Sequence, residues 1–147
     1  MSDGIRSISA SAFDYIQPIN GVSANAVAQF IPNMTLTPIT VWQLSAGGFN
    51  VGGLSGGRFA VPKDGYYTII ADVVFDADSA GDRTARIIIN DADITETVVK
   101  ASSSGDTHVK VRGGGYSLSP GDFISIRVLQ NSGGVLAITS DTYLSII

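Results

Sequence analysis

The single histidine, His108, is the first residue to consider for catalysis, because a Ser-His-Asp triad would need it as the general base. Serines and aspartates are plentiful, but we identify no nucleophile-turn sequence around any serine. The residues around His108, 107–111, alternate between polar and apolar types, as in a half-buried strand. We therefore expect His108 to be a surface or interface residue and the protein not to be an enzyme.

Asp76 and Asp78 open the sequence DADSAGD, which is similar to the start of a calcium-binding loop. Together with Gly81 they occupy positions one, three and six of such a loop. Positions five and twelve, however, are Ala80 and Ile87, which offer no oxygen ligand. An acidic loop in solvent is the simpler interpretation, and a weak calcium site at Asp76 and Asp78 is the alternative. The chain has no cysteine, so thiolate metal sites are excluded, and we expect no cofactor.

The glycine-rich stretch GGFNVGGLSGG, residues 47–57, is the third feature that could carry chemistry. A phosphate-binding loop would need Lys-Ser or Lys-Thr after the last glycine and then a helix, and neither follows. We interpret the stretch as a loop between strands. Phe49, Asn50 and Leu54 are the residues in it that could contact a ligand.

The elements that must position these residues are β-strands, because helical periodicity is almost absent. Short apolar runs are separated by Gly, Asn, Asp and Pro, the pattern of an all-β sandwich or barrel. The predicted strands are 25–31, 35–44, 58–61, 65–75, 83–90, 95–101, 107–112, 116–118, 123–130 and 137–147, the last with a break near Asp141.

Strand 65–75 is unusual because both of its faces are apolar. One face is long enough for a core stripe and consists of Tyr67, Ile69, Ala71, Val73 and Phe75. The opposite face is too apolar for water and consists of Tyr66, Thr68, Ile70, Asp72 and Val74. Either a second copy of the chain or a second sheet of the same chain could cover that face, since large exposed apolar patches are rare on monomers.

The composition agrees with a covered surface. Of the 147 residues, 44% are hydrophobic but only 15% are charged, against about 25% in typical soluble domains. The net charge of −4 and the lack of a clustered Lys/Arg face argue against a nucleic-acid partner. No apolar run approaches the roughly 20 residues of a membrane-spanning helix, so we expect no membrane contact.

Residues 1–24 fit no strand period and are predicted to form an N-terminal arm. They contain no basic start followed by an apolar stretch, so a secretion signal is not expected. Disordered tails are usually poor in large apolar residues. This segment has several, which predicts that the arm docks on a partner through Ile5, Ile8, Phe13, Tyr15 and Ile16.

Three segments in order resemble the superfamily of the complement globular head and tumour necrosis factor. They are RFAVPKDGYYTIIADVVF (58–75), VRGGGYSLSPGDFISIRV (111–128) and the final TYLSII, and IIIND (87–91) resembles a further strand of the complement type. The resemblance covers residues 25–147. It implies one domain with a ten-stranded jelly roll of two packed sheets, assembled as a compact homotrimer.

The resemblance also implies which residues face the three-fold axis. Carried over by position, they are Thr68, Ile70, Val111 and Tyr143. Thr68 and Ile70 belong to the face of strand 65–75 that is too apolar for water, and Tyr143 lies off the core stripe of its own strand. The alternation and the resemblance therefore point to the same surface.

The functional expectation is a non-enzymatic virion protein, a phage capsid decoration or fibre component held to a capsid or tail protein by residues 1–24. A collagen-like stalk, a membrane anchor and a leader are not found, which makes the chain similar to phage and bacterial versions of this superfamily. Such a protein would be made in the host cytoplasm and located in the virion. The alternatives are a tail or fibre module that recognises a host surface carbohydrate or protein, and a bacterial surface-layer or spore-surface protein.

Overall fold

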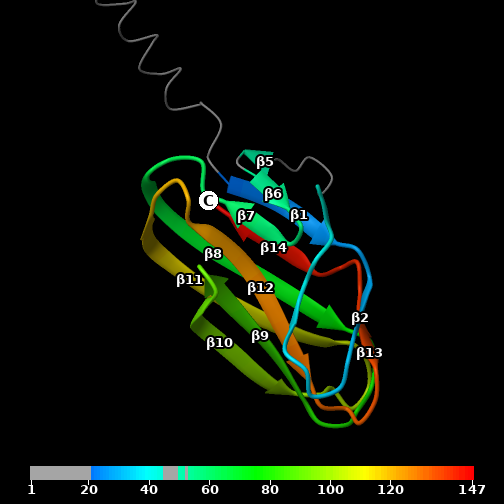
Figure 1. Cartoon of the computed structure of the whole chain (residues 1–147). Coiled ribbons are helices and arrows are strands. Elements are labelled where there is room, and N and C mark those ends of the chain that lie inside the picture. The colour runs from blue at the N-terminus through cyan, green and yellow to red at the C-terminus, as the bar shows by residue number, and fades with distance from the viewer. Residues whose placement is uncertain (1–20, 45–49, 52) are drawn as a thin grey trace, which may run out of the picture.

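The computed structural model describes residues 21–44, 50–51 and 53–147, and in this part the chain is all β. The strands form two antiparallel sheets that are stacked face to face (Figure 1). Within the described residues there is no helix that could cross a membrane. The predicted all-β class is confirmed.

The first sheet, called here the β8 sheet, is organised around its longest central strand. β13 and β14 lie end to end along one edge of β8, β11 lies along the other edge, and β1 continues the sheet beyond β14. Its strands are β1 (Gly21–Ala26), β2 (Gln29–Ile31), β4 (Trp42–Leu44), β5 (Asn50–Val51), β8 (Gly65–Phe75), β11 (Thr107–Leu118), β13 (Leu136–Ile138) and β14 (Tyr143–Ile146).

The second sheet, called the β9 sheet, has the order β10-β9-β12-β7-β6, with β3 paired to β12. Its strands are β3 (Thr37–Pro38), β6 (Gly53–Ser55), β7 (Arg58–Ala60), β9 (Asp82–Ile89), β10 (Ala92–Lys100) and β12 (Phe123–Gln130). In Figure 1 this sheet lies in front of the β8 sheet.

The described part has more strands than the ten predicted, partly because three predicted strands are interrupted, among them 35–44, which is divided into β3 and β4. The predicted strand 137–147 is divided into β13 and β14, and the break lies at 139–142, where the sequence indicated one. Thr142 stabilises the break from a fully buried position: Val74 N–H donates to Thr142 Oγ1 at 2.9 Å. The predicted strand 25–31 is likewise divided into β1 and β2, and it begins earlier than expected, at Gly21.

The core lies between the two sheets and is formed by every second residue of each strand. β8 contributes Tyr67, Ile69, Ala71, Val73 and Phe75, the five residues that the alternation predicted for its core face. The hydroxyl of Tyr67 donates to the Lys63 carbonyl at 2.8 Å. Burial raises the pKa of Tyr67, because the charged phenolate would be poorly solvated there.

Two tight hairpins explain the turn residues of the sequence. Asn90 and Asp91 join β9 to β10 with φ angles of 53° and 64°, and Gly56 and Gly57 join β6 to β7 with 60° and 78°. Two-residue hairpins favour such positive φ values because they match the twist of the flanking strands. At Gly57 a Cβ atom would also lie 2.3 Å from the Ile39 carbonyl oxygen, so no side chain fits.

Candidate functional site

The outward surface of the β8 sheet is the candidate site, because it carries exposed apolar side chains on a flat array of strands. Tyr66 is 78% exposed, Ile70 37% and Ile147 48%. We call this surface the β8 face. Its outward-pointing residues are Ser23, Asn25, Tyr66, Thr68, Ile70, Asp72, His108, Lys110, Arg112, Tyr143, Ser145 and Ile147.

Strand register arranges the middle of the β8 face in rows. In one row Ile70 has Ser145 as its partner on β14 and Arg112 as its partner on β11. In the next row Asp72 lies between Tyr143 and Lys110. Cα atoms of such cross-strand partners are about 4.5–5.5 Å apart, so the side chains of one row are direct neighbours.

The β8 face is apolar at one end and charged at the other. Thr68 pairs with Ile147 through two backbone hydrogen bonds of 2.8 and 2.9 Å, which places Ile147 near Ile70 and Tyr66. Toward the other end, His108 Nδ1 lies 3.2 Å from a carboxylate oxygen of Asp72. The apolar end therefore offers surface for burial, and the charged end offers ionic contacts.

Hydrogen bonds hold the polar residues of the β8 face in place. The hydroxyls of Ser23 and Tyr143 are 2.9 Å apart. The side-chain amide of Asn25 donates to the carbonyls of Ser140 and Thr142 at 3.2 and 3.3 Å. Tyr143 is half-buried and thus has a fixed orientation on the face.

The structure corrects one of the four residues that the resemblance placed at the axis. Thr68, Ile70 and Tyr143 lie on the β8 face, but Val111 is 1% exposed and belongs to the core. A shift of one residue along a strand moves a side chain to the opposite face of the sheet. Along β11, Val109 and Val111 alternate with exposed residues, and both valines lie on the core side. Arg112, next to Ile70, takes the place expected for Val111.

Val74 also differs from the sequence interpretation of strand 65–75. The alternation placed it on the outer face, yet it is 1% exposed. The backbone of Val74 bonds to Thr139 and to Thr142 in the connection between β13 and β14. The apolar part of the outer face therefore ends before Val74, and the intra-chain alternative accounts for this residue.

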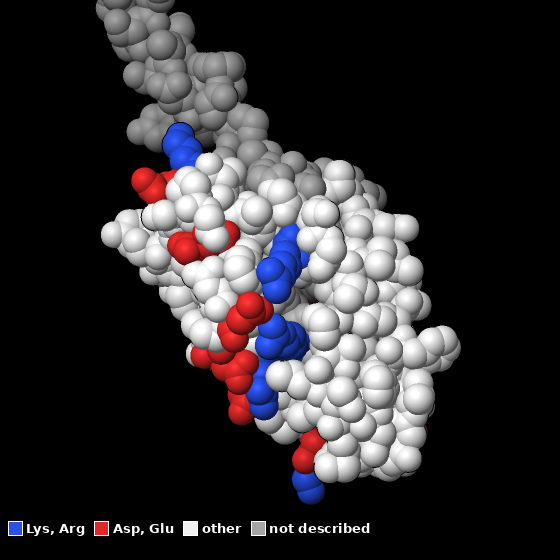
Figure 2. Space-filling model, in the orientation of Figure 1, with Lys and Arg blue, Asp and Glu red and all other residues white. Residues whose placement is uncertain are grey.

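The outward surface of the β9 sheet, called the β9 face, is covered by paired charges. Arg86 contacts Asp93 at 2.8 Å and Glu96 at 2.9 Å. Asp91 accepts from Arg127 at 2.9 Å and from Arg58 at 3.4 Å. Figure 2 shows the result as a row of basic side chains bordered by acidic ones.

Apolar atoms lie beneath and between these charges. Ile88 is on the outward side of β9 but is fully buried. The guanidinium of Arg58 lies 4.2 Å above the Phe123 ring, a cation–π geometry. The β9 face thus pairs its own arginines and covers Ile88, while Val98 on its β10 edge is 53% exposed.

The acidic loop 76–82 is organised by an arginine that the sequence analysis did not single out. Arg83 is fully buried, and its guanidinium donates to the carbonyls of Asp78, Ala80 and Asp82 at 2.8, 2.7 and 3.0 Å. Burial lowers the pKa of Arg83, while Asp78 and Asp82 counteract that shift. The sequence did contain a signal for this role: Arg83 falls on the inward side of the alternating strand β9.

A metal site at Asp76 and Asp78 gains no support from this geometry, because the guanidinium of Arg83 already binds loop carbonyls that a cation would use. Across the described ranges, no group of three or more His, Cys, Asp or Glu side chains could hold a metal ion.

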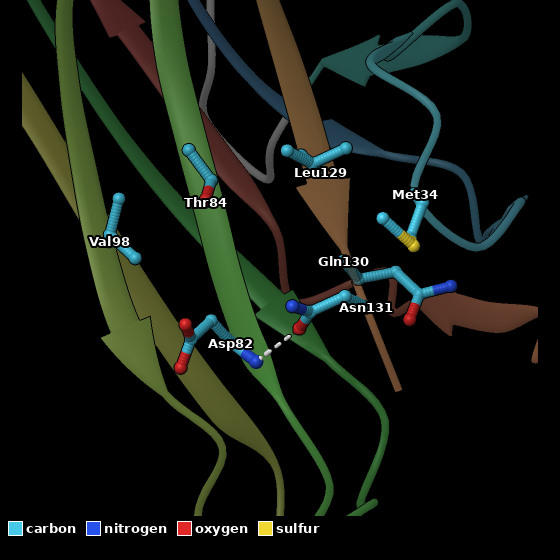
Figure 3. Close-up of a pocket in the computed structure, with 7 residues that line it drawn as sticks. All are labelled: Met34, Asp82, Thr84, Val98, Leu129, Gln130 and Asn131. Carbon is cyan, nitrogen blue, oxygen red and sulfur yellow. Dashed lines mark hydrogen bonds between the residues drawn. The ribbon is translucent and has the colours of Figure 1, made fainter. Parts of the chain in front are cut away.

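Cavities open at more than one place on the surface. One has a volume of about 210 Å³ and is lined by Met34, Thr84, Val98, Leu129 and their neighbours (Figure 3). At its rim, Asp82 N–H donates to Asn131 Oδ1. That volume is below the roughly 300 Å³ at which ligand pockets begin.

The larger cavity, of about 350 Å³, lies where the edges of the two sheets meet. It is lined by Thr40, Val41, Trp42, Leu54, Ser55, Gly56 and Gly57. Trp42 Nε1 is buried and has no hydrogen-bond partner in the described structure. Of the predicted ligand loop, Leu54 lines this cavity and Asn50 belongs to β5, while Phe49 lies outside the described residues.

The described structure contains no catalytic triad around His108, whose side-chain hydrogen bonds go to Asp72 alone. Ser55 lies in the sequence Gly-Leu-Ser-Gly-Gly, which has the spacing of a nucleophile turn and was overlooked in the sequence interpretation. However, it is followed by the Gly56-Gly57 hairpin turn and β7 instead of a helix. The predicted arm residues Ile5, Ile8, Phe13, Tyr15 and Ile16 lie outside the described residues.

Comparisons with known proteins identify the fold. No family model matches the chain, and no curated protein matches it. Among solved structures, Eiger TNF from S. frugiperda superposes with a TM-score of 0.66 at 11% identity, covering 88% of this chain and 92% of that one. Murine APRIL gives 0.64 at 15% identity, covering 87% and 98%.

The globular domain of zebrafish complement 1qA gives a TM-score of 0.60 at 12% identity, covering 88% of this chain and 96% of that one. Identities this low establish a shared fold and nothing further. The chain has the jelly-roll fold of the tumour necrosis factor and complement globular-head proteins.

Proposed function

We propose that the protein is a homotrimer in which the β8 face of each chain is covered by two sister chains. The observation that carries this proposal is the exposure of Tyr66, Ile70 and Ile147 together on one face, with Thr68 between them. Large exposed apolar patches on soluble proteins usually mark contact surfaces. The low charge content of the sequence and the trimer implied by the family resemblance support the same assembly.

The size of the effect is sufficient for a stable assembly. Burial of a large apolar side chain is worth roughly 1.5–3 kcal/mol relative to full exposure, and less for one such as Ile70 that is already partly covered. Three chains repeat every contact three times. Obligate interfaces commonly bury about 2,000 Å² or more, and proteins with such interfaces often have no stable folded monomer.

The assembled protein would be a non-enzymatic structural component of a virion, a phage capsid decoration or fibre element. The support is that no catalytic constellation occurs in the described part of the chain and that the sequence resembles phage versions of this superfamily. Residues 1–20, which precede the first strand, would connect the trimer to a capsid or tail protein.

The first experiment measures the mass in solution by light scattering and sedimentation. The wild-type chain is expected to have three times the chain mass of 15.3 kDa. Ile70→Asp should abolish that species and leave unfolded or aggregated protein. Val98→Asp is the matched control, because Val98 is 53% exposed on β10 of the other sheet and should stay trimeric. A well-folded monomeric wild-type protein would refute the proposal.

The second experiment tests the attachment to the particle. The experiment deletes the arm, and the structure determines where the deletion should end. The predicted arm of residues 1–24 overlaps β1, in which Val22 and Ala24 are fully buried. Deletion of residues 2–20 leaves β1 complete. The shortened chain should still form trimers but fail to co-sediment with capsids or tails that bind the full chain. Equal binding by both chains would exclude the arm as the attachment.

A host-recognition role is the second candidate, and the cavity beside Trp42 and Leu54 favours it. Its lining is uncharged, which suits a neutral sugar unit. Trp42 is the only tryptophan, so its fluorescence reports on this site alone. Titration with a panel of neutral methyl glycosides should change the emission of the wild type but not that of a Leu54→Arg variant, whose side chain would block the cavity. An unchanged emission with every glycoside would remove this candidate.

A further inference from the structure

We propose that the trimer binds one tetrahedral oxyanion, phosphate or sulfate, on its three-fold axis through Arg112 of each chain. The inference rests on the proposed homotrimer, since each chain supplies only a third of the site. It arises from the pairing of β11 with β8. The residue beside Ile70 is Arg112, whereas the resemblance had placed Val111 on the axis.

The position of Arg112 is set by its pairing with β8. Its cross-strand partner is Ile70, whose side chain projects from the same face. If the three copies of Ile70 pack around the axis, each Arg112 lies within about one strand spacing, 4.7–4.9 Å, of that cluster. Assembly therefore brings three guanidinium groups toward a common centre.

The β8 face cannot neutralise these groups by itself. Among the described residues, neither Arg112 nor Lys110 forms an ion pair. The strands that build the face contribute one carboxylate, Asp72, which contacts His108. The charged side chains Asp72, Lys110 and Arg112 sum to +1 on each face, hence +3 for three faces.

Like charges brought together in a water-poor interface repel each other strongly, because the effective dielectric constant there is far below that of water. An oxyanion removes that repulsion and accepts charge-assisted hydrogen bonds from the planar guanidinium groups. A tetrahedral oxyanion has a three-fold axis of its own, so it can present one oxygen to each of three equivalent arginines. This match in charge and symmetry favours phosphate or sulfate over a monovalent halide.

Every other arginine of the described chain is already occupied. Arg58, Arg86 and Arg127 pair with carboxylates on the β9 face, and Arg83 is buried against backbone carbonyls. Arg112 is thus the one described arginine that is available for an external anion. This contrast supplies a matched control, since Arg58→Gln removes the same charge from the opposite sheet.

The test is calorimetric titration of the full-length protein with inorganic phosphate in a chloride buffer. Light scattering on the same samples reports the oligomeric state. We expect one phosphate bound per three chains, with about tenfold or greater loss of affinity in Arg112→Gln and none in Arg58→Gln. Arg112→Lys keeps the charge but loses the planar fork, and it should bind phosphate with intermediate affinity.

The outcomes separate the two proposals. A monomeric wild type refutes the trimer itself. A trimer that binds no phosphate, binds more than one per three chains, or binds equally well after Arg112→Gln refutes the axial anion site alone, the last two outcomes indicating an adventitious ion only. If Asp72→Asn dissociates the trimer and phosphate does not bind, Arg112 pairs with a sister carboxylate instead, and the inference is wrong. If Arg112→Gln itself dissociates, Arg112→Lys serves as the binding comparison.

Discussion

The outer surfaces of the two sheets differ in whether their charged side chains are paired within the same chain. On the β9 face, Arg58, Arg86 and Arg127 are all paired with carboxylates of the same chain. On the β8 face, Arg112 and Lys110 form no ion pair in the described structure, and apolar side chains stand exposed beside them. The arginines of the β9 face are paired within one chain, although Val98 at its edge is exposed. The β8 face combines exposed apolar side chains with cations that form no ion pair in the described structure.

This difference teaches that hydrophobicity alone does not identify a contact surface. Ile88 and Ile70 are both isoleucines on outward sides of central strands. Ile88 is fully buried under its own chain, and Ile70 is 37% exposed. What distinguishes the two faces is whether their neighbouring charges already have partners, since paired arginines can cover apolar atoms with their side-chain stems.

The largest effect should come from Ile88→Ala, because this side chain is buried before any assembly. The expected loss is about 2–4 kcal/mol in the free energy of unfolding, which combines the lost transfer energy with the cavity left behind. Urea denaturation measures it.

The comparison variant is Ile70→Ala on the β8 face. Its loss should be smaller, about 1–2 kcal/mol per chain, because this side chain is only partly covered within its own chain. Equal losses for the two variants would remove the distinction between the faces.

A smaller effect is expected for Asp91→Asn, which removes the carboxylate shared by Arg58 and Arg127. The pair is substantially exposed, so the cost should be at most about 1 kcal/mol, and it should shrink in high salt. A double-mutant cycle with Arg127→Gln isolates the interaction. A coupling energy of zero at low salt would show that the β9 face is ordered without this bridge.

The smallest effect concerns Asp122, in the turn before β12 of the β9 sheet. The backbone N–H of Ser119 and the side-chain amide of Asn90 lower the pKa of Asp122. A carboxyl whose pKa is lower in the folded state contributes stability above its unfolded pKa, about 3.9, and that contribution is lost as the pH falls through the folded value. Thermal melts from pH 5 down to pH 2 should therefore show a flatter acid limb for Asp122→Asn. An unchanged acid limb would contradict the assignment.

The sequence predicted the class of fold and the core face of β8, because these follow from local alternation. It missed the extent of β1, since GVSANA alternates weakly and carries few large apolar residues. The burial of Val74 was also missed. It depends on Thr139 and Thr142, which are far away in the sequence and are brought to β8 only by the completed sheet.

The candidate site was predicted in part. Thr68, Ile70 and Tyr143 lie on the β8 face, as strand alternation requires. Val111 was misplaced because it was carried over by position from the resemblance, whereas the alternation of its own strand puts it with Val109 on the core side. The hydrogen bonds of Arg83 to carbonyls of the loop 76–82 depend on the path of that loop, which no short-range sequence pattern describes.

One feature of β1 bears on how the domain could be mounted. Gly21 lies so close to the carbonyl oxygen of Ile146 that a Cβ atom there would overlap it, and Ile147 is adjacent. The start of β1 and the C-terminus therefore lie at the same end of the molecule (Figure 1). A cargo fused to either end would leave from the same side, while the turns at 76–81, 101–106 and 131–135 form the opposite tip. If a surface held the domain by the side where its two ends lie, the opposite tip would point away from that surface.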